Sequence, residues 1–127
     1  MSARAAQQAS DPLDGRWILV VDDEPAVRVA MARLLSTYGA VCCAAESHER
    51  ALRLLESEPR LEVAILDFTM PDGNGSDLVP QLRAVRPELV MVGTSGADRR
   101  EEFRRSGVDR FLPKPWSVEE LIEQLGH

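Results

Sequence analysis

Residues 18–23 read Ile-Leu-Val-Val-Asp-Asp, so a short apolar run leads directly into two carboxylates. The pattern of an apolar run ending in a polar group recurs in residues 63–67, Val-Ala-Ile-Leu-Asp, and in residues 89–94, Leu-Val-Met-Val-Gly-Thr. Continuous apolar runs of this length are typical of strands buried on both faces in a parallel sheet that is covered by helices. Ligands of such sheets bind in the crevice at the carboxyl ends of the strands. We therefore expect the aspartates that end the first two runs to lie together in one crevice.

Strand and helix patterns alternate over the rest of the chain. The expected strands cover about residues 17–21, 41–44, 63–66, 89–94 and 110–112, and the expected helices cover about 25–38, 48–57, 76–86, 98–106 and 118–125. This alternation predicts an α/β fold with a five-stranded parallel sheet, doubly wound so that helices cover both faces. We expect the flavodoxin-like strand order 2-1-3-4-5, which reverses between strands 1 and 3, and these strands end in the aspartates.

Two of the expected helices carry further local predictions. The first helix has an apolar face that we expect to pack inward; its members are Val27, Ala30, Met31, Leu34 and Leu35. In the third helix, Pro80 fits the first turn, where the missing N–H of proline is tolerated. We therefore expect this helix to begin a few residues after Ser76.

The 127 residues fit one domain that is large enough to fold without disulfides. We expect residues 1–15 to form a flexible N-terminal tail and residues 16–127 to form the domain. The sequence has neither an apolar run long enough to span a bilayer nor the pattern of a secretory signal, so we expect a cytoplasmic protein. Cys42 and Cys43 are neighbours in an expected strand, which predicts two reduced core thiols on opposite faces.

The charged residues are unusual in balance and in kind. The formal net charge of -6 argues against a surface that binds nucleic acid, because phosphate backbones are held by clustered basic residues. Fourteen of the fifteen basic residues are Arg, and Lys114 is the other one. Because lysine offers a compact charge on a flexible stem, Lys114 is a candidate for a specific anion contact. Chance usage is the alternative explanation.

The expected crevice combines residues with a definite chemistry. Three carboxylates at close range repel one another, so Asp22, Asp23 and Asp67 require protons or a cation. Mg²⁺ prefers oxygen ligands and typically takes one or two carboxylates. A remaining carboxylate oxygen can attack phosphorus and form an acyl phosphate if positive donors neutralise the phosphoryl oxygens. Lys114 and the hydroxyl of Thr94 are the candidate donors.

Four motifs together resemble the receiver domain of two-component response regulators. They are residues 20–25 (VVDDEP), residues 66–72 (LDFTMPD) with Gly75 behind them, residues 93–96 (GTSG) and residues 111–115 (FLPKP). Each motif alone is moderately specific, but their order and positions in the expected fold make the combination highly specific. The resemblance spans about residues 16 to 125.

The resemblance implies roles for the residues in these motifs. Asp67 would be the phosphoacceptor, with Asp23 and Asp67 as direct Mg²⁺ ligands and Asp22 acting mainly through water. The main-chain carbonyl of Thr69 would be a further metal ligand. Lys114 and Thr94 would contact the phosphoryl group. Thr94 and Phe111 would form the switch, although Phe111 is as readily explained as a core residue, and it has no hydroxyl to bond the loop after strand 4.

The resemblance also implies partners. The phosphoryl group would come from a phosphohistidine on a histidine kinase or a histidine phosphotransfer protein, and the domain would hydrolyse it slowly rather than act as an enzyme on other substrates. Phosphorylation would alter the face of strand 4, helix 4 and strand 5, which an unknown downstream protein reads. A homodimer through helix 4, strand 5 and helix 5 is possible, although the charged residues of the fourth helix are also typical of a solvated face. We expect no partner among nucleic acids or membranes.

Several alternatives stay open at this point. The chain could be a receiver from a hybrid kinase or a larger regulator, or an interaction module that does not depend on phosphorylation. A Mg²⁺-dependent phosphohydrolase typically has two aspartates separated by one residue after strand 1, whereas Asp22 and Asp23 are adjacent. A nucleotide-binding module would need a glycine-rich loop after the first strand, and the sequence has none at that place. We expect His48 and His127 to be surface residues, and Asp72 to be a turn residue rather than a metal ligand.

Overall fold

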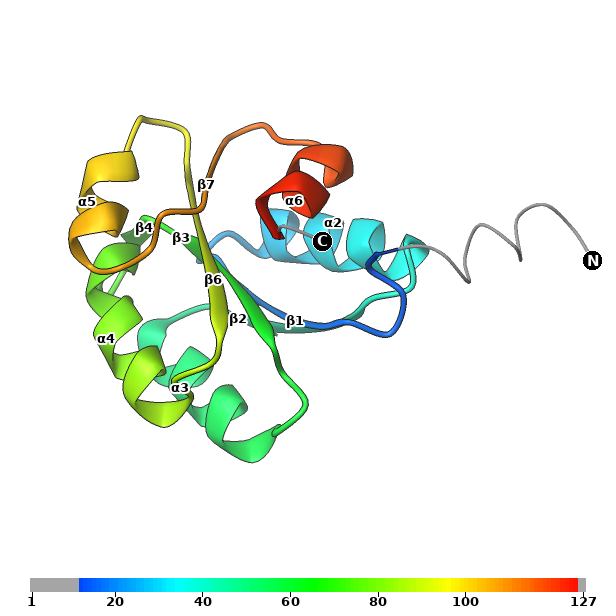
Figure 1. The fold of residues 1–127 in the computed structure, drawn as a ribbon, viewed down its shortest axis with the longest axis horizontal. Helices are drawn as coiled ribbons and strands as arrows, with labels where there is room; N and C mark the ends of the chain where they lie inside the picture. The colour runs from blue at the N-terminus through cyan, green and yellow to red at the C-terminus, as the bar shows by residue number, and fades with distance from the viewer. Residues whose placement is uncertain (1–11, 126–127) are drawn as a thin grey trace, which may run out of the picture.

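The strands of the computed structural model, which describes residues 12–125, form one five-stranded parallel sheet and one small hairpin (Figure 1). The sheet contains β1 (Trp17–Val21), β2 (Val41–Ala45), β3 (Val63–Asp67), β6 (Val90–Ser95) and β7 (Phe111–Pro113). Their order is β2-β1-β3-β6-β7, which is the predicted order 2-1-3-4-5. The hairpin, which the sequence did not predict, pairs β4 (Thr69–Met70) with β5 (Gly73–Asn74).

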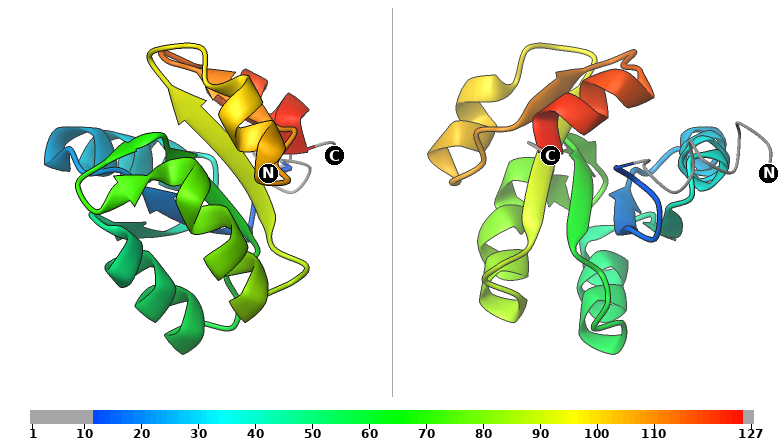
Figure 2. Two further views of the ribbon diagram at one scale, coloured as in Figure 1. Left: turned by 90° about the vertical axis from the view of Figure 1, so that its left-hand side faces the viewer. Right: turned by 45° about the vertical axis from the view of Figure 1, so that its right-hand side comes forward.

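Helices cover both faces of the sheet, as predicted (Figure 1 and Figure 2). One face carries α2 (Pro25–Thr37) and α6 (Val118–Leu125), and the other carries α3 (His48–Ser57), α4 (Gly75–Val85) and α5 (Arg100–Arg105). Alternate residues of β1 enter the two cores, because Ile18 and Val20 pack on the first face, and Leu19 and Val21 pack on the second. No helix within residues 12–125 combines the length and the apolar character that crossing a membrane requires.

The prediction for the first helix is only partly correct. Leu35 is fully buried, but Leu34 is 40% exposed and Ala30 is also exposed. Ala30 and Leu34 line an open groove of about 260 Å³ together with Val27, Met31 and the segment 114–116 that follows β7. The apolar face of α2 is therefore wider than the part that the sheet covers.

The predicted late start of the third helix is wrong. α4 begins at Gly75 and contains Pro80 beyond its first turn. The start is fixed at the preceding residue, because the backbone N–H of Asn74 donates to the Asp77 carboxylate at 3.2 Å. This terminal hydrogen bond determines where the helix begins despite the position of the proline.

The boundary of the domain lies earlier than the predicted residue 16. Leu13 is fully buried and packs in the core beneath α2 and α6. The N–H of Gly15 donates to the carbonyl of Gly39 at 2.9 Å, where Gly39 ends the first helix with φ of +90°. Residues 12–15 are therefore part of the folded domain, and the rest of the predicted tail lies outside the described residues.

The adjacent cysteines lie on opposite faces of β2, as predicted. Cys42 packs with the core beneath α2 and α6, and Cys43 packs with the other core. Both are free and partly buried rather than fully buried. Burial raises the pKa of Cys42 to about 11, so this thiol stays protonated at neutral pH.

Arg86 ties the end of α3 to the start of β3. Its guanidinium donates to the carbonyls of Leu55 at 3.0 Å, Leu61 at 2.6 Å and Glu58 at 3.4 Å. We expect Arg86→Ala to lower the free energy of unfolding by about 2 kcal/mol, because partly buried carbonyls lose their donors. Denaturant unfolding measures this effect. The control is Arg53→Ala, which removes an exposed arginine and should cost less than about 0.5 kcal/mol.

Candidate functional site

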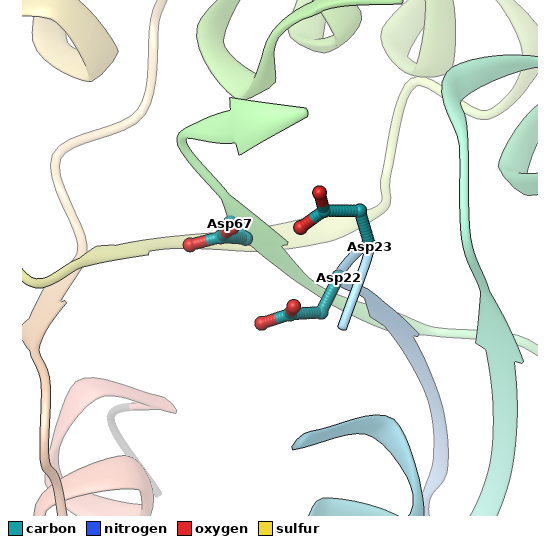
Figure 3. A group of neighbouring side chains, drawn as sticks. All are labelled: Asp22, Asp23 and Asp67. Atoms are coloured by element: carbon teal, nitrogen blue, oxygen red, sulfur yellow. The ribbon is translucent and has the colours of Figure 1, made fainter. Parts of the chain in front are cut away.

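Three carboxylates converge where β1 and β3 end (Figure 3). The two strands pair in parallel with Val21 opposite Leu66, so Asp22 and Asp67 emerge side by side. One carboxylate oxygen from each of these two residues and one from Asp23 all lie within 4.8 Å of one another. Asp22 is 1% exposed and Asp67 is 6% exposed, whereas Asp23 is open to solvent. The structure thus brings together the three aspartates that the sequence predicted to meet.

Lys114 completes this cluster from the other side. Its Nζ lies 3.0 Å from Asp22 Oδ2 and 3.1 Å from Asp67 Oδ1. The backbone places the side chain, because the N–H of Lys114 donates to the carbonyl of Ser95 at 2.9 Å just beyond β7. The peptide bond between Lys114 and Pro115 is cis. The single lysine of the chain is therefore an internal counter-ion of the carboxylates.

The cluster contains more negatively charged groups than positively charged ones. Burial raises the pKa of Asp67 above its ordinary value, and the charges of Asp22 and Asp23 act in the same direction, while Lys114 opposes them. Burial also disfavours the charged ammonium of Lys114, but its hydrogen bonds to Asp22 and Asp67 raise the pKa above the usual lysine value. The cluster thus combines three carboxylates with one ammonium group, which pairs with two of them, and this arrangement is suited to a further positive ion.

Asp22 makes a second contact besides its ion pair with Lys114. Asp22 Oδ1 accepts the N–H of Glu24 at 3.0 Å, and Asp22 Oδ2 accepts from Lys114. Asp22 therefore already uses both carboxylate oxygens in protein contacts.

Behind Asp67, the N–H of Gly75 donates to the carbonyl of Phe68 at 2.7 Å. A Cβ atom at Gly75 would lie 2.1 Å from the carbonyl oxygen of Asp67, so only glycine permits this approach.

Thr94 lies beside Asp67 in the neighbouring strand. The two residues are paired in the register of β3 and β6, and Thr94 is 1% exposed. Its hydroxyl donates to the carbonyl of Leu112 in β7 at 2.6 Å. A contact between Thr94 and a phosphoryl group would require the hydroxyl to exchange this partner.

Phe111 belongs to an aromatic cluster that the sequence did not predict. Phe103 stacks edge-on to Phe68 at 6.0 Å between ring centroids and packs against Phe111 at 6.1 Å. Phe103 is fully buried above Gly93, where a Cβ atom would come within 2.4 Å of the ring. Two features of the sequence could have indicated this cluster. Gly93 stands next to Thr94 in an apolar strand, and Phe103 is the one large apolar residue of a polar helix.

The structure corrects one histidine prediction. His48 is buried, with 6% exposure, whereas we expected a surface residue; His127 lies outside the described residues. The imidazole ring packs against Gly73 of the hairpin, where a Cβ atom would lie 3.1 Å from its Cε1 atom. Asp72 is a turn residue, as predicted, and its carboxylate accepts the N–H of His48 at 3.0 Å.

Comparisons with known proteins find similar sequences and structures over most of the chain. The family model of the response regulator receiver domain matches residues 18–126 of the chain. The response regulator MprA of Mycolicibacterium vanbaalenii is 36% identical over 111 residues, which are 85% of this chain and 48% of that protein. The chain thus spans about half the length of the curated relatives it matches.

Solved structures share the fold over most of the chain. A response regulator receiver protein from Pseudomonas putida is 30% identical with a TM-score of 0.79, covering 88% of this chain and 96% of that one. A response regulator from Burkholderia pseudomallei, solved with a phosphorylated aspartic acid, a calcium ion and citrate, is 25% identical with a TM-score of 0.80. That similarity covers 87% of this chain and 66% of that one.

Proposed function

Because the chain belongs to the receiver domain family of two-component response regulators, we propose that Asp67 accepts a phosphoryl group from a phosphohistidine of a histidine kinase or histidine phosphotransfer protein. The observation that carries this proposal is the convergence of three carboxylates and Lys114 at the carboxyl ends of the strands. The phosphorylated aspartic acid in the similar Burkholderia protein supports the same chemistry here.

The acidic cluster is the proposed Mg²⁺ site. Asp23, Asp67 and the main-chain carbonyl of Thr69 hold the ion, and Asp22 acts mainly through water. The donor set supports this assignment, because it consists of hard oxygen ligands, and the pKa of Asp67 is raised by burial and by the neighbouring carboxylates. When bound, Mg²⁺ neutralises the negative charge that develops on the phosphoryl oxygens.

In the proposed transfer, an oxygen of the Asp67 carboxylate attacks phosphorus in line. A P–O bond forms while the P–N bond to the donor imidazole breaks, and the imidazole nitrogen leaves with the electron pair of that bond. Lys114, now 3.1 Å from Asp67 Oδ1, holds a phosphoryl oxygen. Slow attack by water on the acyl phosphate restores the carboxylate, so the domain catalyses only its own phosphorylation cycle.

The proposed switch runs from Thr94 to Phe111. The Thr94 hydroxyl leaves the carbonyl of Leu112 and bonds a phosphoryl oxygen, which shifts the loop after β6. Phe111 adjusts its packing against Phe103, and the exposed face of α5 and β7 changes. Contacts that exist only in the phosphorylated state can supply the few kcal/mol that a population shift requires.

Two surfaces are proposed for partners. The apolar groove of α2 shares Lys114 with the site, and we propose it as the surface on which the histidine-bearing donor docks. The face of α5, β7 and α6 serves the downstream protein or a second copy of the chain. A cytoplasmic location is part of this proposal, because a histidine kinase or histidine phosphotransfer protein would meet the chain there.

The test is incubation of the chain with Mg²⁺ and acetyl phosphate or phosphoramidate, followed by intact mass. We expect one phosphoryl adduct per chain that hydroxylamine removes, because hydroxylamine cleaves acyl phosphates. Chelation of Mg²⁺ with EDTA should abolish the adduct. The absence of an adduct in the presence of Mg²⁺ would overturn the proposal, and release of many phosphates per chain from phosphate esters would favour the phosphohydrolase instead.

A further inference from the structure

The hairpin of β4 and β5 directly follows Asp67 and carries Thr69, whose carbonyl is the proposed metal ligand. Its strands pair Thr69 with Asn74 and Met70 with Gly73. Met70 is buried in the core with 8% exposure, whereas Thr69, Pro71 and Asp72 are exposed. Met70 is therefore the residue through which the hairpin is anchored in the core, and contacts outside the core must also fix the position of the hairpin.

Asp72 supplies one such contact, because it connects the tip of the hairpin to the start of α3. Its carboxylate accepts the N–H of His48 at 3.0 and 3.1 Å and the N–H of Glu49 at 3.5 Å. These are the first two residues of α3, whose terminal N–H groups have no partner inside the helix. Desolvation acts against the charged form, but the N–H donors lower the pKa of Asp72, and a carboxylate is favoured at a helix N-terminus.

His48 supplies the second contact. The imidazole is buried beneath the hairpin, and a Cβ atom at Gly73 would lie 3.1 Å from its Cε1 atom. Its Nε2 atom is buried and has no hydrogen-bond partner within residues 12–125. The Nε2 atom therefore gives the hairpin no hydrogen bond, and the ring meets the hairpin by packing against Gly73.

We propose that Asp72 and His48 are positioning residues for the metal site, because they fix the hairpin on α3 and thereby place the carbonyl of Thr69. The inference rests on the proposed function, since it concerns the Mg²⁺ site assigned there. It extends that site to a helix on which none of the proposed ligands lies. Residues that support metal ligands commonly change metal affinity when they are replaced.

The test compares Mg²⁺ affinity by isothermal titration calorimetry for the wild type, Asp72→Ala, Asp72→Asn and His48→Ala. We expect about a ten-fold rise in Kd for the two alanine variants and a smaller rise for Asp72→Asn, which keeps one acceptor oxygen. His48→Phe should restore affinity close to that of the wild type, because phenylalanine supplies a ring of similar volume. Phosphorylation by acetyl phosphate should need correspondingly more Mg²⁺ while reaching the same extent at saturation.

Ser47→Ala is the matched control, because Ser47 Oγ accepts the N–H of Arg50 at 3.2 Å and so caps the same helix without contacting the hairpin. It should lower the unfolding temperature and leave the Mg²⁺ Kd unchanged. Equal Mg²⁺ affinities in the wild type and both Asp72 variants would overturn the inference, as would an equal loss of affinity in Ser47→Ala. A wild type that neither binds Mg²⁺ nor becomes phosphorylated would instead refute the proposed function.

Discussion

Asp67→Asn should form no hydroxylamine-sensitive phosphoryl adduct under conditions that phosphorylate the wild type. The amide lacks the charged oxygen that attacks phosphorus, while it retains the size and the position of the carboxylate between Lys114 and Asp22. Intact mass after incubation with Mg²⁺ and acetyl phosphate measures the effect. An adduct of unchanged yield and lability in this variant would move the phosphoacceptor to another residue.

The same variant should be at least as stable as the wild type when Mg²⁺ is absent. Burial and the neighbouring carboxylates raise the pKa of Asp67 in the folded state, so the folded chain binds this proton more tightly than the unfolded chain. Stability consequently falls as pH rises from the ordinary aspartate pKa through the raised pKa of Asp67. Asp67→Asn removes that loss. Thermal unfolding in EDTA across this pH range should show a shallower decline for the variant, which separates lost chemistry from lost folding.

Gly75→Ala should disrupt both the fold and the phosphorylation of the domain. The new Cβ would lie 2.1 Å from the carbonyl oxygen of Asp67 and 3.1 Å from Cα of Phe68, and both are backbone atoms that cannot rotate away. We expect a loss of about 3 kcal/mol or more in the free energy of unfolding. Relief of the overlap requires a shift of about 1 Å in the segment that carries Asp67, and misplacement on that scale can slow a reaction by about 100-fold.

The control for this change is Gly96→Ala in the loop after β6. A Cβ atom there would meet nothing within 4 Å, so the stability should change by less than about 0.5 kcal/mol. Urea unfolding of both variants gives the comparison. If Gly75→Ala unfolded at the same urea concentration as Gly96→Ala, the close approach of the backbone behind Asp67 would not constrain this segment.

The sequence was sufficient for features that depend on local patterns. Apolar runs located the central strands, and the alternation of strand and helix patterns located the helices; at the start of α6, Ser117 and Glu120 form a reciprocal capping pair. The convergence of Asp22, Asp23 and Asp67 followed from the order of parallel strands. The assigned roles of these residues remain predictions that the phosphorylation experiments address.

Features that depend on contacts distant in sequence could not be predicted in this way. His48 is buried and packs against Gly73, which lies far along the chain. Leu13 is buried because Gly15 and Gly39 bring two chain segments together. Leu34 is exposed because the sheet covers only part of the apolar face of α2, which periodicity alone cannot reveal.

The ring of Phe103 packs against Gly93 and so connects the six-residue helix α5 to the sheet. The surface of this helix is almost entirely charged, so a partner meets arginines and glutamates. Arg100 lies over the ring of Phe111, and Phe103 anchors the helix with its ring against Gly93, in the strand that carries Thr94. If α5 lifted away, a hole about the size of that ring would open beside Thr94, and an unfilled cavity is costly. We therefore expect a displacement of β6 to move α5 with it and to change how the charged surface of this helix is presented.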